Sequence, residues 1–99
     1  MITKIVGVTF PNRNGSDRQE IIRRCRIGES ISLIREPENE YDSNAVKVCR
    51  CNGDQLGYIK RDWAVKLAGM LDSGWQYTGK ILDIQSAGGK SVVGVTIQF

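Results

Sequence analysis

The sequence contains no histidine, the residue type that most often carries protons in catalysis at neutral pH. Histidine is also the commonest metal ligand and the usual partner of a nucleophilic serine or cysteine. Its absence removes the usual templates for nucleases and nucleotide hydrolases, and neither a metal-ligand cluster nor another catalytic base stands out. We therefore expect a protein that is not an enzyme.

Cysteines are few and odd in number: Cys25, Cys49 and Cys51. Without a secretory signal this set does not indicate a disulfide framework, and we expect free thiols. Cys49 and Cys51 form a C-x-C pair inside a predicted strand, which would place both side chains on one face. Structural zinc sites usually need paired C-x₂₋₄-C motifs, which the chain lacks, so we predict neither a metal nor a cofactor.

Long apolar runs are also missing, since none approaches the roughly 18 residues that span a bilayer. The first ten residues, MITKIVGVTF, lack the cleavage-site pattern of a signal peptide. We expect a cytoplasmic protein without a membrane segment. A length of 99 residues, with 40% hydrophobic and 25% charged residues, is typical of a single globular domain over 1–99.

The formal net charge is only +3, but the charges are distributed unevenly along the chain. Basic residues dominate 13–26 and 47–66, whereas acidic residues dominate 29–42. The acidic segment interrupts the two basic ones, which argues against a long phosphate-binding track. Charged residues are mostly exposed, so a solvated surface of mixed sign is the simpler interpretation of each segment.

Hydrophobic periodicity and turn residues predict six strands and two short helices. Asn52-Gly53 is a strong hairpin signal, and a second hairpin is expected around the SAGGK segment at 86–90. The strands are expected at 2–10, 30–35, 45–50, 55–60, 75–84 and 91–99.

The inward faces of several strands are predicted from alternating apolar residues. One face of the first strand is predicted to hold Ile2, Val6, Val8 and Phe10. Ile31 and Leu33 are predicted to share a face, as are Val46 and Val48. In the last strand one face holds Val93, Val95, Ile97 and Phe99, with Ile81 expected opposite them.

Capping residues predict the ends of the two helices. Ser16 followed by Gln19 is typical of a capping box and indicates a helix over 17–25. Asp62 is predicted to cap the second helix, and Gly74 is expected just beyond its end. The apolar residues of this second helix recur at helical spacing: Trp63, Leu67, Met70 and Leu71.

The element order, one strand, a helix, three strands, a helix and two strands, does not alternate as in a parallel α/β sheet. It favours a mainly β fold, a six-stranded partly open antiparallel barrel with two short helices. Small barrels of this kind often carry a binding groove on one face.

The polar loop 36–44 and the hairpin after it hold the residues that most suggest binding. Tyr41 lies among turn residues outside any apolar period, with Asp42 and Asn44 beside it. An aromatic ring near cations suits a nucleotide, because bases stack on rings while lysine and arginine neutralise phosphates. The cations and a further ring follow on the second strand of the hairpin: Tyr58, Lys60 and Arg61. The alternative is that Tyr41 folds back over the barrel end and Asp42 caps a turn.

The sequence around these residues resembles the HIRAN family. Its members are small domains found in helicase-like DNA-repair remodelling proteins and as short bacterial proteins. The resemblance rests on VGVTF at 6–10, REPENEYDSNAVKV at 35–48, QLGYI at 55–59 and the helix end at 67–74. It implies an OB-like barrel that binds the 3′ end of single-stranded DNA, with a helicase or nuclease as a partner in DNA repair.

By this resemblance, Tyr41 and Phe10 look like the rings that hold the terminal base, and Asp42 like the acceptor of the 3′-hydroxyl. Asn39 then corresponds to a loop contact with the terminal nucleotide. Tyr58, Lys60 and Arg61 would face the DNA backbone.

This chain departs from the eukaryotic members at two positions, with Thr9 where they have a basic residue and Tyr58 where they have a histidine. Both changes remove potential phosphate contacts. A protein-interaction module that uses the barrel groove without nucleic acid is therefore the alternative function. The choice between DNA and RNA and the oligomeric state are left open by the sequence.

Overall fold

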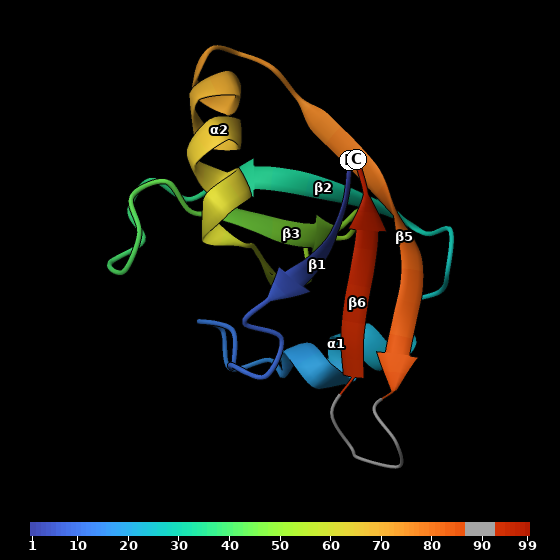
Figure 1. Cartoon of the computed structure of the whole chain (residues 1–99). Helices are drawn as coiled ribbons and strands as arrows, with labels where there is room; N and C mark the ends of the chain where they lie inside the picture. Colours follow the sequence, from blue (N-terminus) through green and yellow to red (C-terminus); the bar gives the residue numbers. More distant parts are fainter. Residues whose placement is uncertain (87–92) are drawn as a thin grey trace.

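The structure is a computed structural model that describes residues 1–86 and 93–99. Over these ranges the chain forms six strands and two helices in the predicted order. In chain order they are β1 (Ile2–Val6), α1 (Arg18–Arg24), β2 (Ser30–Arg35), β3 (Val46–Arg50), β4 (Gln55–Ile59), α2 (Arg61–Asp72), β5 (Tyr77–Ser86) and β6 (Val93–Gln98) (Figure 1).

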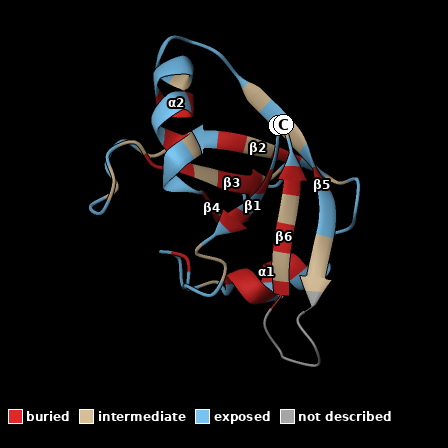
Figure 2. Cartoon of the chain, in the orientation of Figure 1, coloured by how far each residue is buried: buried red, intermediate tan, exposed pale blue. Residues whose placement is uncertain are grey.

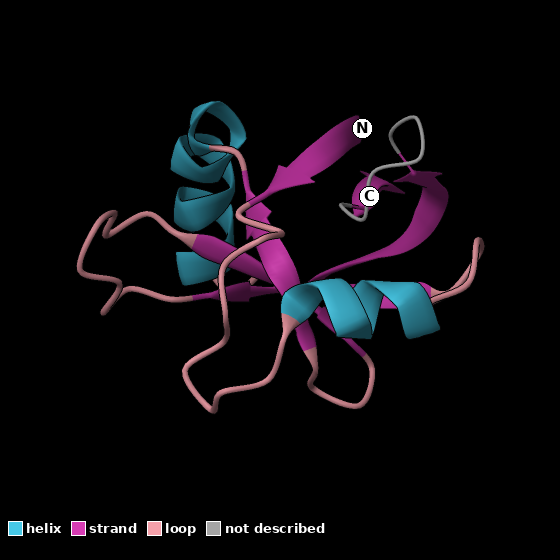
Figure 3. Ribbon diagram, turned by 90° about the horizontal axis from the view of Figure 1, so that it is seen from below, coloured by secondary structure: helices cyan, strands magenta, loops and turns pink. Residues whose placement is uncertain are grey.

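The strands form a closed antiparallel barrel in the order β1-β4-β3-β2-β5-β6, with β6 pairing back to β1. Helix α1 packs against β4 and β6, and α2 packs against β2 and β3, so the helices cover different parts of the barrel (Figures 1 and 3). The predicted mainly β, six-stranded antiparallel barrel with two short helices is confirmed. The barrel is closed rather than partly open, because β1 pairs with both β4 and β6.

Buried apolar residues from all six strands form one core cluster. Figure 2 marks the buried positions of the strands in red. The faces predicted for β2, β3 and β6 are confirmed, and Ile81 pairs directly with Ile97 across β5 and β6. Helix α1 adds Ile21 and Ile22 to this core. Each such side chain contributes about 1.5–3 kcal/mol when it is fully buried.

Strand β1 ends at Val6 rather than at the predicted Phe10. Gly7 turns the chain with a φ of +69°, and the N–H of Phe10 donates to the Gly7 carbonyl oxygen at 3.3 Å. In β1 the buried residues are Thr3 and Ile5. The predicted face of residues 2, 6, 8 and 10 is therefore wrong, since residues 8 and 10 lie beyond the turn and their parity says nothing about β1.

Helix α1 is capped by Asp17 instead of the predicted Ser16. The Asp17 carboxylate accepts a hydrogen bond from the Gln19 N–H at 2.9 Å. The Ser16 hydroxyl is engaged elsewhere, because it donates to Asn14 Oδ1 at 2.6 Å. As a result the helix begins at Arg18, and its first two residues, Arg18 and Gln19, are buried against the barrel.

The β3–β4 hairpin has the predicted turn at Asn52-Gly53, where the Gly53 N–H donates to the Arg50 carbonyl oxygen at 2.9 Å. A bulge between Val48 and Cys49 shifts the register of β3 against β4. Cys49 is buried and Cys51, beyond the end of β3, is exposed. The prediction that these two cysteines share a face is wrong, because both the bulge and the strand end intervene.

Helix α2 begins earlier than predicted. The N–H groups of Trp63 and Ala64 both donate to the Lys60 carbonyl oxygen, so Lys60 is the cap, and Asp62 lies in the first turn. The predicted Asp62 cap is wrong. The apolar side that packs on the barrel holds Trp63, Leu67 and Leu71, whereas Met70 is exposed. Gly74 follows the helix end with a φ of +98°, as predicted.

The last two strands start later than predicted, β5 at Tyr77 and β6 at Val93. Trp75, expected in β5, precedes the strand and is exposed. Most of the predicted SAGGK loop lies outside the described residues. Within residues 1–86 and 93–99, no helix has the length and hydropathy of a membrane span.

Candidate nucleic-acid interface

The loop 36–45, which joins β2 to β3 and projects from the barrel (Figure 1), is built from two consecutive turns. The Asn39 N–H donates to the Glu36 carbonyl oxygen, and the Ala45 N–H donates to the Asp42 carbonyl oxygen, both at 3.1 Å. Proline, here Pro37, favours the second position of the first turn. The Glu36 N–H closes the base of the loop on the Ala45 carbonyl oxygen at 2.9 Å.

The Asn39 side chain holds the loop from inside. Its Oδ1 accepts from the N–H groups of Tyr41 and Asp42 at 2.9 and 3.0 Å. Its Nδ2 donates to Glu36 Oε1 at 2.8 Å and lies 3.3 Å from the hydroxyl of Tyr58 in β4. Asn39 therefore ties the backbone of the loop tip to the barrel wall.

Both predicted stacking rings are exposed, Tyr41 to 82% and Phe10 to 66%. Tyr41 does not fold back over the barrel end, so this part of the alternative interpretation is wrong. Its other part, that Asp42 caps a turn, agrees with the hydrogen bond from the Asn44 N–H to Asp42 Oδ1. Among the described residues, ring contacts link Trp63, Tyr77 and Phe99, and neither Tyr41 nor Phe10 is stacked on another ring. Their faces are open to a planar ligand, and their arrangement around one base stays a prediction.

The carboxylate of Asp42 lies next to Tyr41 and is mostly buried. Its Oδ1 accepts from the Asn44 N–H at 2.9 Å, which fixes the carboxylate in the second turn of the loop. Its Oδ2 is 3.6 Å from Arg61 Nε, and Arg61 Nη2 donates to the Tyr41 carbonyl oxygen at 3.4 Å. Asp42 Oδ2 can therefore still accept a hydrogen bond, and it lies beside the positive charge of Arg61.

These contacts form one polar cluster, made of Glu36, Asn39, Tyr41, Asp42, Tyr58 and Arg61. Glu36 comes from the acidic segment 29–42, for which a solvated surface was the simpler interpretation. The Tyr58 hydroxyl donates to its Oε1 at 2.6 Å, and Asn39 donates to the same oxygen. Burial acts to raise the pKa of Glu36, but these two hydrogen bonds, together with the positive charges of Lys47 and Arg13, outweigh it and the pKa is lowered. Glu36 is therefore ionised and half-buried. Its place directly after β2, ahead of a proline turn, was the available sequence signal.

Phe10 joins the cluster through Gly7 and Tyr58. A Cβ added to Gly7 would lie 3.3 Å from Arg18 Nη1, 3.6 Å from Tyr58 Cδ2 and 3.8 Å from Phe10 Cδ2. The Arg18 guanidinium lies over the Tyr58 ring, 5.1 Å from its centroid. Tyr58 thus contacts the Phe10 turn with its ring and the Tyr41 loop with its hydroxyl.

The structure brings seven of the eight predicted site residues into contact with this cluster or its immediate neighbours. Six of them are Asn39, Tyr41, Asp42, Asn44, Tyr58 and Arg61, and Phe10 adjoins them at Gly7. Lys60 is exposed at the α2 cap. The prediction that Lys60 and Arg61 belong to the same strand as Tyr58 is wrong, because β4 ends at Ile59.

A groove of about 480 Å³ borders the cluster on the side of Glu36. Its lining is largely polar and includes Asn12, Arg13 and Lys47. Neither Tyr41 nor Phe10 lines this groove. The two rings are thus outside it, on the surface next to it.

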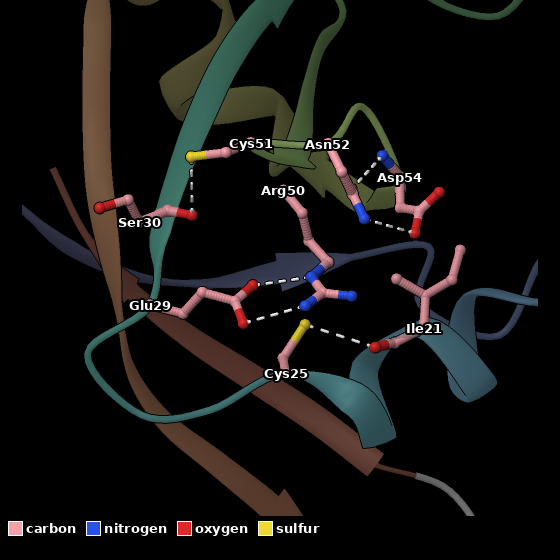
Figure 4. A network of polar contacts seen from close by, with 8 residues as sticks. All are labelled: Ile21, Cys25, Glu29, Ser30, Arg50, Cys51, Asn52 and Asp54. Carbon is pink, nitrogen blue, oxygen red and sulfur yellow. Dashed lines mark hydrogen bonds and ion pairs between the residues drawn. The ribbon is translucent and has the colours of Figure 1, made fainter.

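A second polar cluster lies between the α1–β2 connection and the β3–β4 turn (Figure 4). Arg50 donates to both carboxylate oxygens of Glu29 at 2.7 and 3.2 Å, which lowers the pKa of Glu29 against the opposing effect of burial. Burial, with a smaller effect from Glu29, raises the pKa of the Cys25 thiol to about 11, so Cys25 is a poor nucleophile.

All three cysteines are free, as predicted. Among the described residues, no group of three or more cysteine, aspartate or glutamate side chains is arranged to hold a metal ion.

A small closed β-barrel that displays an aromatic loop beside cations belongs to the OB-like class of ligand-binding barrels. A family model described as the HIRAN domain matches residues 1–98, and the chain belongs to that family. The resemblance seen in the sequence is thereby confirmed.

The curated relatives are much longer proteins. The helicase-like transcription factor of Oryctolagus cuniculus is 49% identical over 45 residues, which cover 46% of this chain and 4% of the relative. The Fanconi-associated nuclease 1 homolog of Arabidopsis thaliana is 33% identical over 92 residues, which cover 92% of this chain and 9% of the relative. This chain therefore spans less than a tenth of either relative.

Two solved structures share the fold over nearly the whole chain. The crystal structure of a protein from Lactobacillus plantarum has a TM-score of 0.77 and 25% identity, covering 97% of this chain and 87% of that one. The crystal structure of the HIRAN domain of human HLTF has a TM-score of 0.69 and 25% identity, covering 98% of this chain and 71% of that one.

Proposed function

We propose that this HIRAN domain is a non-catalytic module that binds the 3′-hydroxyl end of single-stranded DNA. Its relatives include a helicase-like transcription factor and a Fanconi-associated nuclease homolog, whose names connect them with nucleic acid. In this proposal the domain brings a DNA end to a helicase or nuclease partner during repair.

The observation that carries the proposal is the exposed Tyr41 ring held beside the Asp42 carboxylate. A ring exposed to 82% on a hydrogen-bonded loop offers its face to a base at little ordering cost. Stacking of a base on such a ring is worth about 1–3 kcal/mol and does not depend on sequence. Phe10 supplies the second ring, and Lys60 and Arg61 supply cations for the nearby phosphates.

The acidic surroundings favour a hydroxyl over a phosphate at the strand end. Asp42 Oδ2 retains accepting capacity and would accept from a 3′-hydroxyl. Glu38 and Glu40 are exposed on the same loop and would repel a terminal phosphate. In this proposal the Asn39 side chain holds Tyr41 and Asp42 in position, and the backbone N–H of Asn44 holds the Asp42 carboxylate.

Fluorescence anisotropy with labelled oligonucleotides that end in a 3′-hydroxyl or a 3′-phosphate tests the proposal. We expect the phosphate end to bind roughly tenfold more weakly or worse, because it loses a charged hydrogen bond and meets a carboxylate. Asp42→Asn keeps an oxygen for the Asn44 N–H but removes the charge, so the difference between the two ends should shrink. Asp62→Asn is the matched control for net charge. Equal affinities of the wild-type protein for both ends would reject 3′-hydroxyl recognition.

The alternative is a protein-interaction module that uses the barrel groove. The salt dependence of binding distinguishes it from DNA binding. DNA binding should weaken steeply between about 50 and 200 mM salt, because phosphate contacts release counterions. Binding to a partner protein through apolar contacts would change much less.

A further inference from the structure

Arg18, the first residue of α1, is the most deeply buried cation of the chain's described part, with 5% of its surface exposed. Its Nε donates to Asn12 Oδ1 at 2.6 Å, and its Nη1 donates to the Gly7 carbonyl oxygen at 2.7 Å. Its third contact is the face of the Tyr58 ring. All three partners are neutral.

Among the described residues, no ion pair includes Arg18, whereas four other arginines form one each. Arg23, Arg35, Arg50 and Arg61 each pair with a carboxylate. Within residues 1–86 and 93–99, Arg18 has no carboxylate partner, and residues 87–92 contain no acidic residue that could supply one. A buried cation without a counter-charge keeps a desolvation cost that neutral hydrogen bonds offset only in part.

One donor group of Arg18 is still available. Nε and Nη1 are used, whereas the structure gives Nη2 no hydrogen-bond partner among the described residues. Nη2 is also accessible at the surface. Among the described residues, the one fully buried side-chain nitrogen or oxygen atom without a hydrogen-bond partner is Gln85 Oε1, so Nη2, which has no partner, is not fully buried. The guanidinium is therefore fixed by two bonds and can donate a third to a ligand.

The Arg18 guanidinium lies beside the same turn as Phe10. Arg18 Nη1 and Phe10 Cδ2 both lie within 4 Å of the point where a Gly7 Cβ would be, so the guanidinium and the exposed ring flank the same turn. A nucleotide stacked on Phe10 would bring its backbone close to this turn.

We infer that Arg18 is a phosphate-binding residue of this domain, whose Nη2 contacts a backbone phosphate of the strand stacked on Phe10. This inference rests on the proposed function. The phosphate supplies the counter-charge that Arg18 lacks in the free protein. Because the guanidinium is already oriented by Asn12 and Gly7, little side-chain entropy is lost on binding.

The first test is the salt dependence of single-stranded DNA binding by Arg18→Gln, with Arg24→Gln, an exposed cation of the same helix, as the control. Loss of one phosphate contact should reduce the slope of log K against log salt by about 0.7. Affinity should fall roughly tenfold or more at low salt. Circular dichroism checks that the variant is folded. A folded variant with an unchanged slope would overturn the inference.

The second test changes the oligonucleotide, and its arm with the wild-type protein does not depend on folding of a variant. Single uncharged methylphosphonate linkages are placed one at a time near the 3′ end of the oligonucleotide. We expect one linkage to weaken binding both in the wild-type protein and in a Lys60→Gln, Arg61→Gln variant, and to have no further effect in Arg18→Gln. The inference is wrong if every linkage that weakens binding in the wild-type protein loses its effect once Lys60 and Arg61 are replaced, because Arg18 then contacts no phosphate.

These tests separate the two proposals. A wild-type protein that binds single strands without preferring a 3′-hydroxyl contradicts the proposed end recognition but not the phosphate contact. A protein that keeps the end preference while Arg18→Gln leaves both slope and linkage sensitivity intact contradicts the phosphate contact alone. Absence of any DNA binding rejects both.

Discussion

At the scale of single residues, Tyr41 combines a fixed backbone with an exposed side chain that contributes little to stability. Its ring makes no core contact and is mostly exposed, while its N–H and carbonyl oxygen are bonded to Asn39 and Arg61. The backbone of Tyr41 is thus fixed and its ring is free. Replacement of the ring should therefore separate an effect on binding from an effect on folding.

We predict that Tyr41→Ala lowers affinity for single-stranded DNA by about 1–3 kcal/mol, the value of one stacked base. The thermal unfolding midpoint should change little, since exposed substitutions usually alter stability by about 0.5 kcal/mol or less. Tyr41→Phe keeps the ring face and should bind nearly as well as the wild type. Trp75→Ala, which removes another exposed ring, is the control, and anisotropy titration is the measurement. Normal binding by Tyr41→Ala would remove this ring from the interface.

The residues of the cluster differ in how far the sequence predicts them. Tyr41 and Asp42 could be singled out because an aromatic and a carboxylate interrupt a run of turn residues. Glu36 differs from Glu38 and Glu40 in the sequence only by its place directly after a strand and ahead of Pro37, which does not by itself indicate burial. Only the contact with Tyr58, 22 residues away in the chain, makes Glu36 a half-buried acceptor.

At the scale of elements, Gln19 attaches α1 to the barrel as a strand residue would. Its Nε2 donates to the carbonyl oxygens of Val8 and Val93 at 2.8 and 3.0 Å, and its Oε1 accepts from the Val93 N–H at 2.6 Å. These bonds satisfy backbone groups at the start of β6 that water reaches poorly, because Gln19 and Val93 are buried. The short helix α1 is thereby held by a polar contact as well as by Ile21 and Ile22.

We predict that Gln19→Ala destabilises the domain by roughly 2–4 kcal/mol, since it leaves buried backbone groups without partners. For a domain of this size, that corresponds to a lower unfolding midpoint by about 8 °C or more. Glu20→Ala, which removes only an exposed pair with Arg23, should have little effect. Differential scanning calorimetry measures both. A drop of less than about 2 °C for Gln19→Ala would mean that water replaces its hydrogen bonds.

Element boundaries were the least predictable feature, for identifiable reasons. β2 was predicted over its observed residues because alternation and flanking turn residues agree. β1 was predicted too long because Gly7, with no local partner to mark it as a turn, continues an apolar run. Both helix caps were misplaced by one or two residues, since several neighbouring side chains could serve and tertiary contacts decide among them.

At the scale of the whole molecule, closure of the barrel brings the two ends of the described chain together. The terminal amino group of Met1 donates to the Phe99 carbonyl oxygen at 2.8 Å, and the Phe99 N–H donates back to the Met1 carbonyl oxygen at 2.9 Å. The sequence predicted the number and order of strands but not this closure. Pairing of β1 with both β4 and β6 depends on long-range contacts that no local pattern encodes.

Because the two ends adjoin, circular permutants can separate the integrity of the barrel from the continuity of the loop 36–45. We predict that a chain joined from Phe99 to Met1 by a short glycine-serine linker, and opened at Asn52-Gly53, folds and binds single-stranded DNA within about threefold of the wild type, since only a tight surface turn is cut. A second permutant, opened between Tyr41 and Asp42, should give the same far-ultraviolet circular dichroism but bind at least tenfold more weakly, because the loop that orients the ring and the carboxylate is no longer continuous. Equal binding by the two permutants would show that the loop 36–45 is not the interface. An unfolded first permutant would show that the β3–β4 turn, rather than the pairing of β1 with β6, holds the barrel together.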